Sequence, residues 1–196
     1  MSRRNNPKKL LWASVGLFAL IVSYLSPQVT SLVTTGAPAP EPGYYKVVDF
    51  ADGDTITVDM NGKREKVRLI GVDTPEKQHP DKPKQCYSHQ ASEFTKQRIT
   101  AQGGVVRLVA DPTNDPRDRY NRLLRYVYLK DNTLLNKELI ATGHGFEYTL
   151  FPFQKKDEFI TTQAAAKSAK KGLWGACTTT KDGKTWRTQP MSQSNN

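Results

Sequence analysis

The chain has 196 residues, of which 37% are hydrophobic. This is enough for one domain of ordinary size with tails and too little for two full domains. Lysine and arginine outnumber aspartate and glutamate by 29 to 19, which gives a net charge of +10. This excess favours polyanionic partners, because it raises their encounter rate and releases their counterions. A soluble domain that is basic for no such reason remains the alternative.

The first 33 residues combine a basic flank, SRRNNPKK, with the apolar run LLWASVGLFALIVSYL. This order is typical of a secretory signal or of an N-terminal membrane anchor, with the rest of the chain outside the cytoplasm. As a helix, Leu10–Leu25 spans about 24 Å, which is short for a bilayer core of about 30 Å. Continuation to Val33 reaches the required length.

The length leaves these two alternatives close, and the cleavage signal favours one of them. The A-x-A sequence Ala37-Pro38-Ala39 is followed directly by Pro40, a poor position for the peptidase. We therefore favour an uncleaved anchor over a cleaved signal. Residues 34–43, TTGAPAPEPG, then form an extended Pro-rich linker.

Residues 44–177 carry the pattern of a small barrel with helices packed on it, a class that often binds nucleic acid. Residues 55–60 alternate apolar and polar side chains with the period of a half-buried strand. Asn61-Gly62 is the strongest short hairpin signal, because both residues tolerate positive φ. Five strands are expected, at residues 44–50, 55–60, 63–72, 105–110 and 123–129. Three helices are expected, at residues 88–102, 134–143 and 154–171.

The ends of these elements give further expectations. Ser88 is a plausible N-cap of the first helix, and Gly103-Gly104 ends it. The tail, residues 178–196, is polar and is predicted to be disordered.

Cys86 and Cys177 are the two cysteines of the chain. Outside the cytoplasm, an even pair indicates one disulfide, which would hold the last helix to the barrel. His79, His89 and His144 form no metal-binding spacing, and we interpret them as surface or packing residues.

Acidic residues gather at both ends of the first hairpin. Because the turn pairs Met60 with Lys63, we expect Asp54, Asp73 and Glu76 to converge at one end. Two carboxylates and a carbonyl, completed by water, suit a hard cation such as Ca²⁺, and a third carboxylate could act as a base. The alternative is that DGDT and DTPE are ordinary turn and cap sequences.

Arg68 and Arg122 offer planar guanidinium groups suited to phosphate oxygens. A strict hairpin register would place Arg68 beside Thr55, on the face opposite Asp54. A one-residue bulge would reverse this, so the register arithmetic leaves the face of Arg68 open.

The sequences DGDT, VRLIGVDTPE, DRYNR and GLW occur in one order and spacing, and in this the chain resembles the staphylococcal nuclease family. The resemblance covers about residues 44–177. It implies a five-stranded OB-fold barrel with three α-helices, here preceded by the N-terminal hydrophobic segment.

The resemblance also implies the metal site and the base. Asp54, Asp73 and the main-chain carbonyl of Thr74 match the ligands of Ca²⁺. Glu76 matches the general base of the family.

The phosphate-binding residues follow in the same way. Arg68 and Arg122 match the arginines that bind the scissile phosphate. Arg119 and Tyr120 match the pair that holds the neighbouring phosphate, with arginine where the family has lysine. The segment 144–153 departs from the family pattern, and this leaves the base-stacking residues unassigned.

The implied function is a Ca²⁺-dependent endonuclease that hydrolyses DNA and RNA to 3′-phosphate products and acts as a monomer. One alternative is a non-catalytic nucleic-acid-binding OB-fold module tethered to a membrane. Another is a tethered protein-interaction domain. The preference between DNA and RNA is left open.

Overall fold

The computed structural model describes residues 43–77 and 83–190. The predicted membrane segment, residues 1–33, lies outside them, as does the linker up to residue 42. Among the described residues, no helix combines the length and the apolar character needed to span a bilayer.

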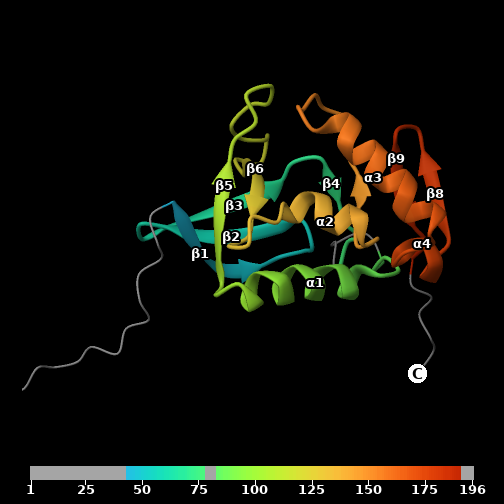
Figure 1. The fold of residues 1–196 in the computed structure, drawn as a ribbon, viewed down its shortest axis with the longest axis horizontal. Helices are drawn as coiled ribbons and strands as arrows, with labels where there is room; N and C mark the ends of the chain where they lie inside the picture. Colours follow the sequence, from blue (N-terminus) through green and yellow to red (C-terminus); the bar gives the residue numbers. More distant parts are fainter. Residues whose placement is uncertain (1–42, 78–82, 191–196) are drawn as a thin grey trace, which may run out of the picture. The chain divides into compact units, whose positions relative to one another are not determined.

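Five strands close into a barrel in the order β1, β2, β3, β6 and β5 (Figure 1). The closing pair is β5 with β1, and β3 runs parallel to β6. This confirms the predicted OB-type barrel. The bounds are Tyr44–Phe50 for β1, Thr55–Met60 for β2, Lys63–Leu69 for β3, Val105–Val109 for β5 and Leu123–Tyr128 for β6.

The β2–β3 hairpin has the predicted turn and register. Asn61 and Gly62 have φ values of 58° and 87°, and Met60 pairs with Lys63. The apolar positions of both strands point into the barrel, where Ile56 and Val67 are fully buried. The alternating pattern therefore fixes which side of this hairpin forms the core.

A second, two-stranded sheet pairs β4 (Val72–Asp73) with β7 (Phe146–Glu147), and Asp73 lies opposite Phe146. Of these two strands, β4 follows closely after β3 in the chain, whereas β7 comes from the segment after α2 (Leu135–Ala141).

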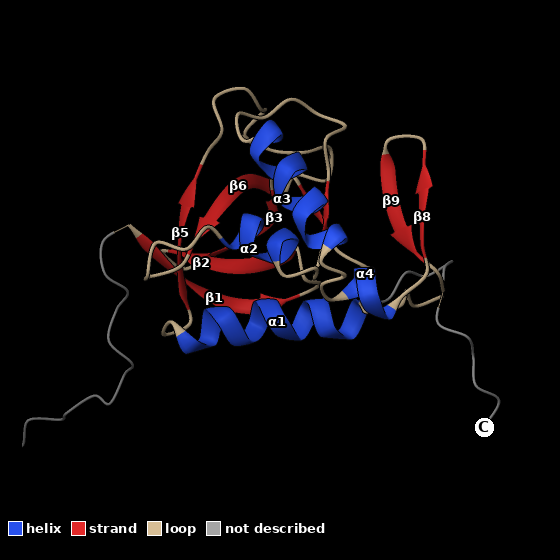
Figure 2. Ribbon diagram, turned by 45° about the vertical axis from the view of Figure 1, so that its right-hand side comes forward, coloured by secondary structure: helices blue, strands red, loops and turns tan. Residues whose placement is uncertain are grey.

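The described residues form four helices, of which α1 and α2 pack directly on the barrel (Figure 2). Helix α1 (Ser88–Ala101) lies along β1, and α2 (Leu135–Ala141) packs against both β6 and α3 (Lys156–Ser168). Helix α4 (Leu173–Ala176) is a single turn.

The predicted N-cap of α1 is wrong. Ser88 is buried as the first helical residue, and Tyr87, with φ of 71°, occupies the cap position without a side-chain hydrogen bond. The Ser88 N–H donates instead to the main-chain carbonyl of Gln85 at 3.2 Å.

Asn136 of α2 joins this helix to the barrel and is fully buried. Its Oδ1 accepts a hydrogen bond from the Val127 N–H at 2.8 Å. Its Nδ2 donates to the carbonyls of Ile70 at 2.9 Å and Arg125 at 3.2 Å. One amide thus satisfies main-chain groups of β6 and of the turn after β3.

Cys86 and Cys177 form the predicted disulfide, with their Cα atoms 6.1 Å apart. His144 is a packing residue, as expected, because its ring stacks on Phe94 with the centroids 4.1 Å apart. His89 is exposed on α1, and His79 lies outside the described residues.

The prediction of a disordered tail is wrong for residues 178–190. They form a hairpin of β8 (Thr179–Asp182) and β9 (Thr185–Thr188). The Trp186 ring packs against Trp174, with the centroids 5.2 Å apart. The polar composition of this segment gave no indication that Trp186 would pack against the rest of the domain.

Replacing Asn136 with alanine should lower the free energy of unfolding by about 3 kcal/mol, because buried main-chain groups would lose their partners. Urea denaturation at neutral pH measures this change. The neighbouring Lys137→Ala breaks only an exposed ion pair with Glu158, so it should cost less than about 1 kcal/mol. Equal losses in the two variants would contradict the anchoring role of Asn136.

Candidate active site

The predicted site residues meet where the β2–β3 hairpin approaches β4. Asp54 directly precedes β2, and its main-chain carbonyl accepts a hydrogen bond from the Leu69 N–H at 2.9 Å. Asp54 therefore lies opposite Leu69, as the hairpin arithmetic predicts. Asp73 ends β4, and both carboxylates reach one arginine, Arg68.

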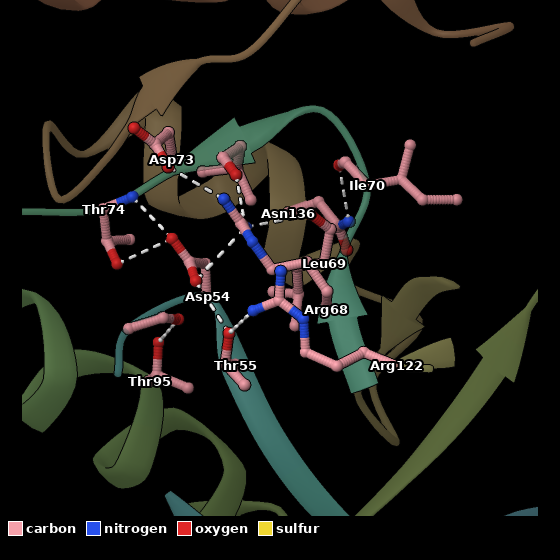
Figure 3. A network of polar contacts seen from close by, with 12 residues as sticks. Asp54, Thr55, Arg68, Leu69, Ile70, Asp73, Thr74, Thr95, Arg122 and Asn136 are labelled. Atoms are coloured by element: carbon pink, nitrogen blue, oxygen red, sulfur yellow. Dashed lines mark hydrogen bonds and ion pairs between the residues drawn. The ribbon is translucent and has the colours of Figure 1, made fainter. Parts of the chain in front are cut away.

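Arg68 keeps the strict register and pairs with Thr55, so there is no bulge in the β2–β3 pairing. Its guanidinium nevertheless lies 3.2 Å from Asp54 Oδ1 and 2.8 Å from Asp73 Oδ1 (Figure 3). It also donates to the carbonyl of Val72 at 2.6 Å. Asp54 stands in the bend before the strand, so strand alternation does not constrain its side chain. This is why a strict register still brings the two charges together.

Asp54 is a buried acceptor for several donors. Its Oδ2 accepts from the Thr74 N–H at 2.7 Å and from Thr74 Oγ1 at 2.9 Å. Its Oδ1 accepts from Thr55 Oγ1 at 3.0 Å. Gly53 makes this packing possible, since a Cβ atom there would lie 2.9 Å from the Thr74 methyl group.

Arg122 comes from the loop before β6 and is held by Asp118. Its Nε donates to Asp118 Oδ2 at 2.7 Å, and the other Asp118 oxygen accepts from the Arg122 N–H at 2.9 Å. An Nη atom reaches Thr55 Oγ1 at 3.5 Å (Figure 3). Asp118 was not among the predicted site residues, although its place four residues before Arg122 in DRYNR was a usable signal.

A cleft of about 600 Å³ opens beside these arginines. It brings together four of the predicted residues, which are Arg68, Arg119, Tyr120 and Arg122.

The open side of this cleft is aromatic. Arg119 donates to the Tyr120 hydroxyl at 2.9 Å and stacks over its ring. Tyr120 is 65% exposed and Phe151 is 61% exposed. Tyr148 and Phe153 also line the cleft, so the divergent segment 144–153 supplies three rings to it. The pattern of the family could not locate them.

The acidic side of the site carries uncompensated negative charge. Desolvation of its carboxyl group and the carboxylates of Asp54 and Asp52 raise the pKa of Glu76 to about 7, although the residue as a whole is exposed. Burial raises the pKa of Asp73 to about 6, against the opposing effect of Arg68. For Arg68, burial alone would lower the pKa, but the surrounding carboxylates outweigh burial and raise it.

The possible ligands of a metal ion are few. Within residues 43–77 and 83–190, no three histidine, cysteine or acidic side chains form a group that could hold an ion. The predicted set of Asp54, Asp73 and the Thr74 carbonyl therefore needs water to complete a coordination shell. All of its donors are oxygens, which are the ligands that Ca²⁺ prefers. The like charges that raise the neighbouring pKa values also favour a cation, so the donor set fits this ion in its chemistry. A bound ion would share the carboxylate oxygens of Asp54 and Asp73 with Arg68, which contacts both.

A closed five-stranded barrel with arginines and carboxylates gathered at its strand ends places the protein among OB-fold enzymes. Residues 66–176 match the family model described as staphylococcal nuclease homologue. The chain belongs to the staphylococcal nuclease family, and its enzyme class is that of a nuclease.

Three relatives illustrate the likeness. The thermonuclease of Staphylococcus hyicus is 42% identical over 131 residues, which are 66% of this chain and 75% of the relative. The thermonuclease of Staphylococcus intermedius is 42% identical over 132 residues, which are 66% of this chain and 73% of that relative. The endonuclease YncB of Bacillus subtilis is 38% identical over 128 residues, which are 63% of this chain and 57% of that relative.

Proposed function

We propose that this protein is a Ca²⁺-dependent endonuclease that hydrolyses the phosphodiester bonds of DNA and RNA and leaves 3′-phosphate products. One observation carries the proposal. Arg68 and Arg122 border one cleft, where Arg68 contacts Asp54 and Arg122 contacts the neighbouring Thr55. The charge of Asp54 in turn acts on the nearby Glu76 carboxyl group. The arginines that would bind a phosphate therefore lie near a carboxylate that could activate water.

Asp54, Asp73 and the Thr74 carbonyl would hold the calcium ion. When bound, the ion supplies positive charge that stabilises the developing charge on the phosphate. Arg68 is already fixed beside two of these ligands, so its charge acts at the same place.

The protein residues then divide the chemistry. Arg68 and Arg122 bind the scissile phosphate and stabilise the charge that develops on its oxygens. Asp118 holds Arg122 at its Nε, so the Nη groups, one of which contacts Thr55 Oγ1 at 3.5 Å, are the ones that would bind the phosphate. Glu76 takes a proton from the attacking water, and the 5′-oxygen leaves in line. Electrostatic stabilisation of this kind is usually the largest catalytic term, and one well-aimed donor contributes roughly 3–4 kcal/mol.

The outer part of the cleft serves substrate binding. Arg119 and Tyr120 hold the neighbouring phosphate. Tyr148 and Phe151, whose ring centroids are 6.2 Å apart, offer apolar faces for unpaired bases, and such stacking tolerates any sequence.

No observation favours the non-catalytic alternative. A binding module has no use for Glu76, yet Glu76 is present together with Arg68 and Arg122. The likeness to thermonucleases and endonucleases also supports the catalytic function.

Activity on single-stranded DNA and on RNA should require Ca²⁺. Without a cation, the negative charge of Asp54 and Asp73 would repel the phosphate. The measurement uses the chain without residues 1–33. Its release of acid-soluble nucleotides, with Ca²⁺ or with excess chelator, gives this dependence. Readdition of Ca²⁺ should restore the activity, which controls for unfolding. Full activity in chelator would refute the role given to these two residues.

Glu76→Gln should lower kcat by about 10²-fold or more, in line with general-base contributions, while DNA binding persists. Arg68→Lys and Arg122→Lys should also be severely impaired, because an ammonium group cannot form the bidentate contact. Steady-state kinetics and a filter-binding assay give both quantities. The exposed Arg64→Lys and the helical Glu93→Gln are matched controls and should behave as wild type. Near-normal turnover of Glu76→Gln would require another base.

We also propose that the nuclease domain acts outside the cytoplasm, held to the membrane by residues 1–33. The disulfide between Cys86 and Cys177 supports an oxidising compartment. The basic flank of the apolar run should keep the N-terminus in the cytoplasm.

N-terminal sequencing of the protein from its native host tests the anchor. An uncleaved anchor predicts a chain that keeps residues 1–33 and that fractionates with membranes. A mature chain that starts between Ser26 and Gly43 would instead mean a cleaved signal.

A further inference from the structure

The main chain of Glu76 is held by a residue that the mechanism has not used. Gln85 Oε1 accepts a hydrogen bond from the Glu76 N–H at 3.0 Å. The Gln85 N–H donates to the Glu76 carbonyl at 3.1 Å. Gln85 therefore fixes the peptide groups on both sides of the Glu76 Cα atom, and so the direction in which this side chain leaves the backbone.

Gln85 is in turn held by the segment around its neighbour, Cys86. Cys86 is bonded to Cys177, and its N–H donates to the carbonyl of Gln189 at 2.9 Å. The Cys86 carbonyl accepts from Thr188 Oγ1 at 2.9 Å. The disulfide and the β8–β9 hairpin thus fix Cys86 from both sides.

The same hairpin also touches the strands that carry Asp73. Trp186 of β9 stacks on Phe146, with the ring centroids 6.5 Å apart. Phe146 is the residue of β7 that lies opposite Asp73 in β4. One structural element, residues 178–190, therefore adjoins the supports of both Glu76 and Asp73. It follows the segment that matches the family model.

We propose that Gln85 is a positioning residue for Glu76, and that the disulfide and the β8–β9 hairpin act on turnover by holding Gln85 in place. The inference rests on the proposed function of Glu76 as the general base. A displacement of about 1 Å in a catalytic group can cost about 10²-fold in rate. A main chain held at both its N–H and its carbonyl limits such displacement.

Two substitutions of similar size separate positioning from packing. Gln85→Met removes the acceptor, whereas Gln85→Glu keeps a carboxylate oxygen for the Glu76 N–H. With single-stranded DNA and Ca²⁺, Gln85→Met should lower kcat about 10-fold while KM stays within about twofold, because only the transition state is affected. Gln85→Glu should keep kcat within about threefold of wild type, and the exposed Gln90→Met is the control. An unchanged kcat in Gln85→Met, or a loss expressed in KM alone, would overturn the inference.

A double-mutant cycle tests the disulfide. Cys86→Ser/Cys177→Ser should lower kcat by a factor similar to Gln85→Met, in protein shown by circular dichroism to be folded at the assay temperature. Adding Gln85→Met to it should lower kcat little further, since both changes act through one contact. Two losses that multiply would show that the disulfide does not act through Gln85. If the cysteine variant does not fold, the comparison of Gln85→Met with Gln85→Glu still decides the inference.

Glu76→Gln, measured in the same series, distinguishes the two proposals. If it keeps normal turnover, the proposed base is wrong and the positioning role falls with it. If it is inactive while Gln85→Met and the cysteine variant keep full kcat, the proposed function stands and only this inference fails.

Discussion

The ion pair between Asp54 and Arg68 is the interaction on which the site depends. Both side chains are largely removed from solvent, and their atoms lie 3.2 Å apart. Burying two charges costs several kcal/mol unless hydrogen bonds satisfy them. Here Thr55 and Thr74 complete the shell of Asp54. Because these threonines come from the start of β2 and from the chain after β4, one carboxylate fixes the relative position of both.

Much of the fold could be predicted from local patterns. The alternation in residues 55–60 and the Asn61-Gly62 turn set the hairpin register, because both signals act between neighbours in the chain. The identity of the site residues came from family motifs. The contact of Arg68 with Asp54 could not be predicted, since it depends on a bend that strand periodicity does not describe. Asp118, by contrast, could have been found, because it lies four residues before Arg122 in DRYNR.

The two errors concern the tail and the start of α1, and they have different causes. The composition of residues 178–190 is polar, and composition alone indicates disorder. Their order depends on the nearby Trp174 and on main-chain bonds to Cys86, which lies far away in the sequence. Ser88 resembles a cap, but the carbonyl of Gln85 takes its N–H. Both cysteines could be named from the sequence, but the hairpin that bonds to Cys86 could not be predicted.

The disulfide also determines the covalent topology of the enzyme. It closes a ring of chain from Cys86 to Cys177, 91 residues apart in sequence. Arg122 lies on this ring, while Arg68 lies in the part of the chain that precedes Cys86. The exposed loop around Pro112 lies on the ring as well. A protease that cuts there opens the ring but does not divide the molecule, because both fragments stay joined through sulfur. In a compartment where proteases are present, a single cut would therefore leave the two arginines in one covalent molecule.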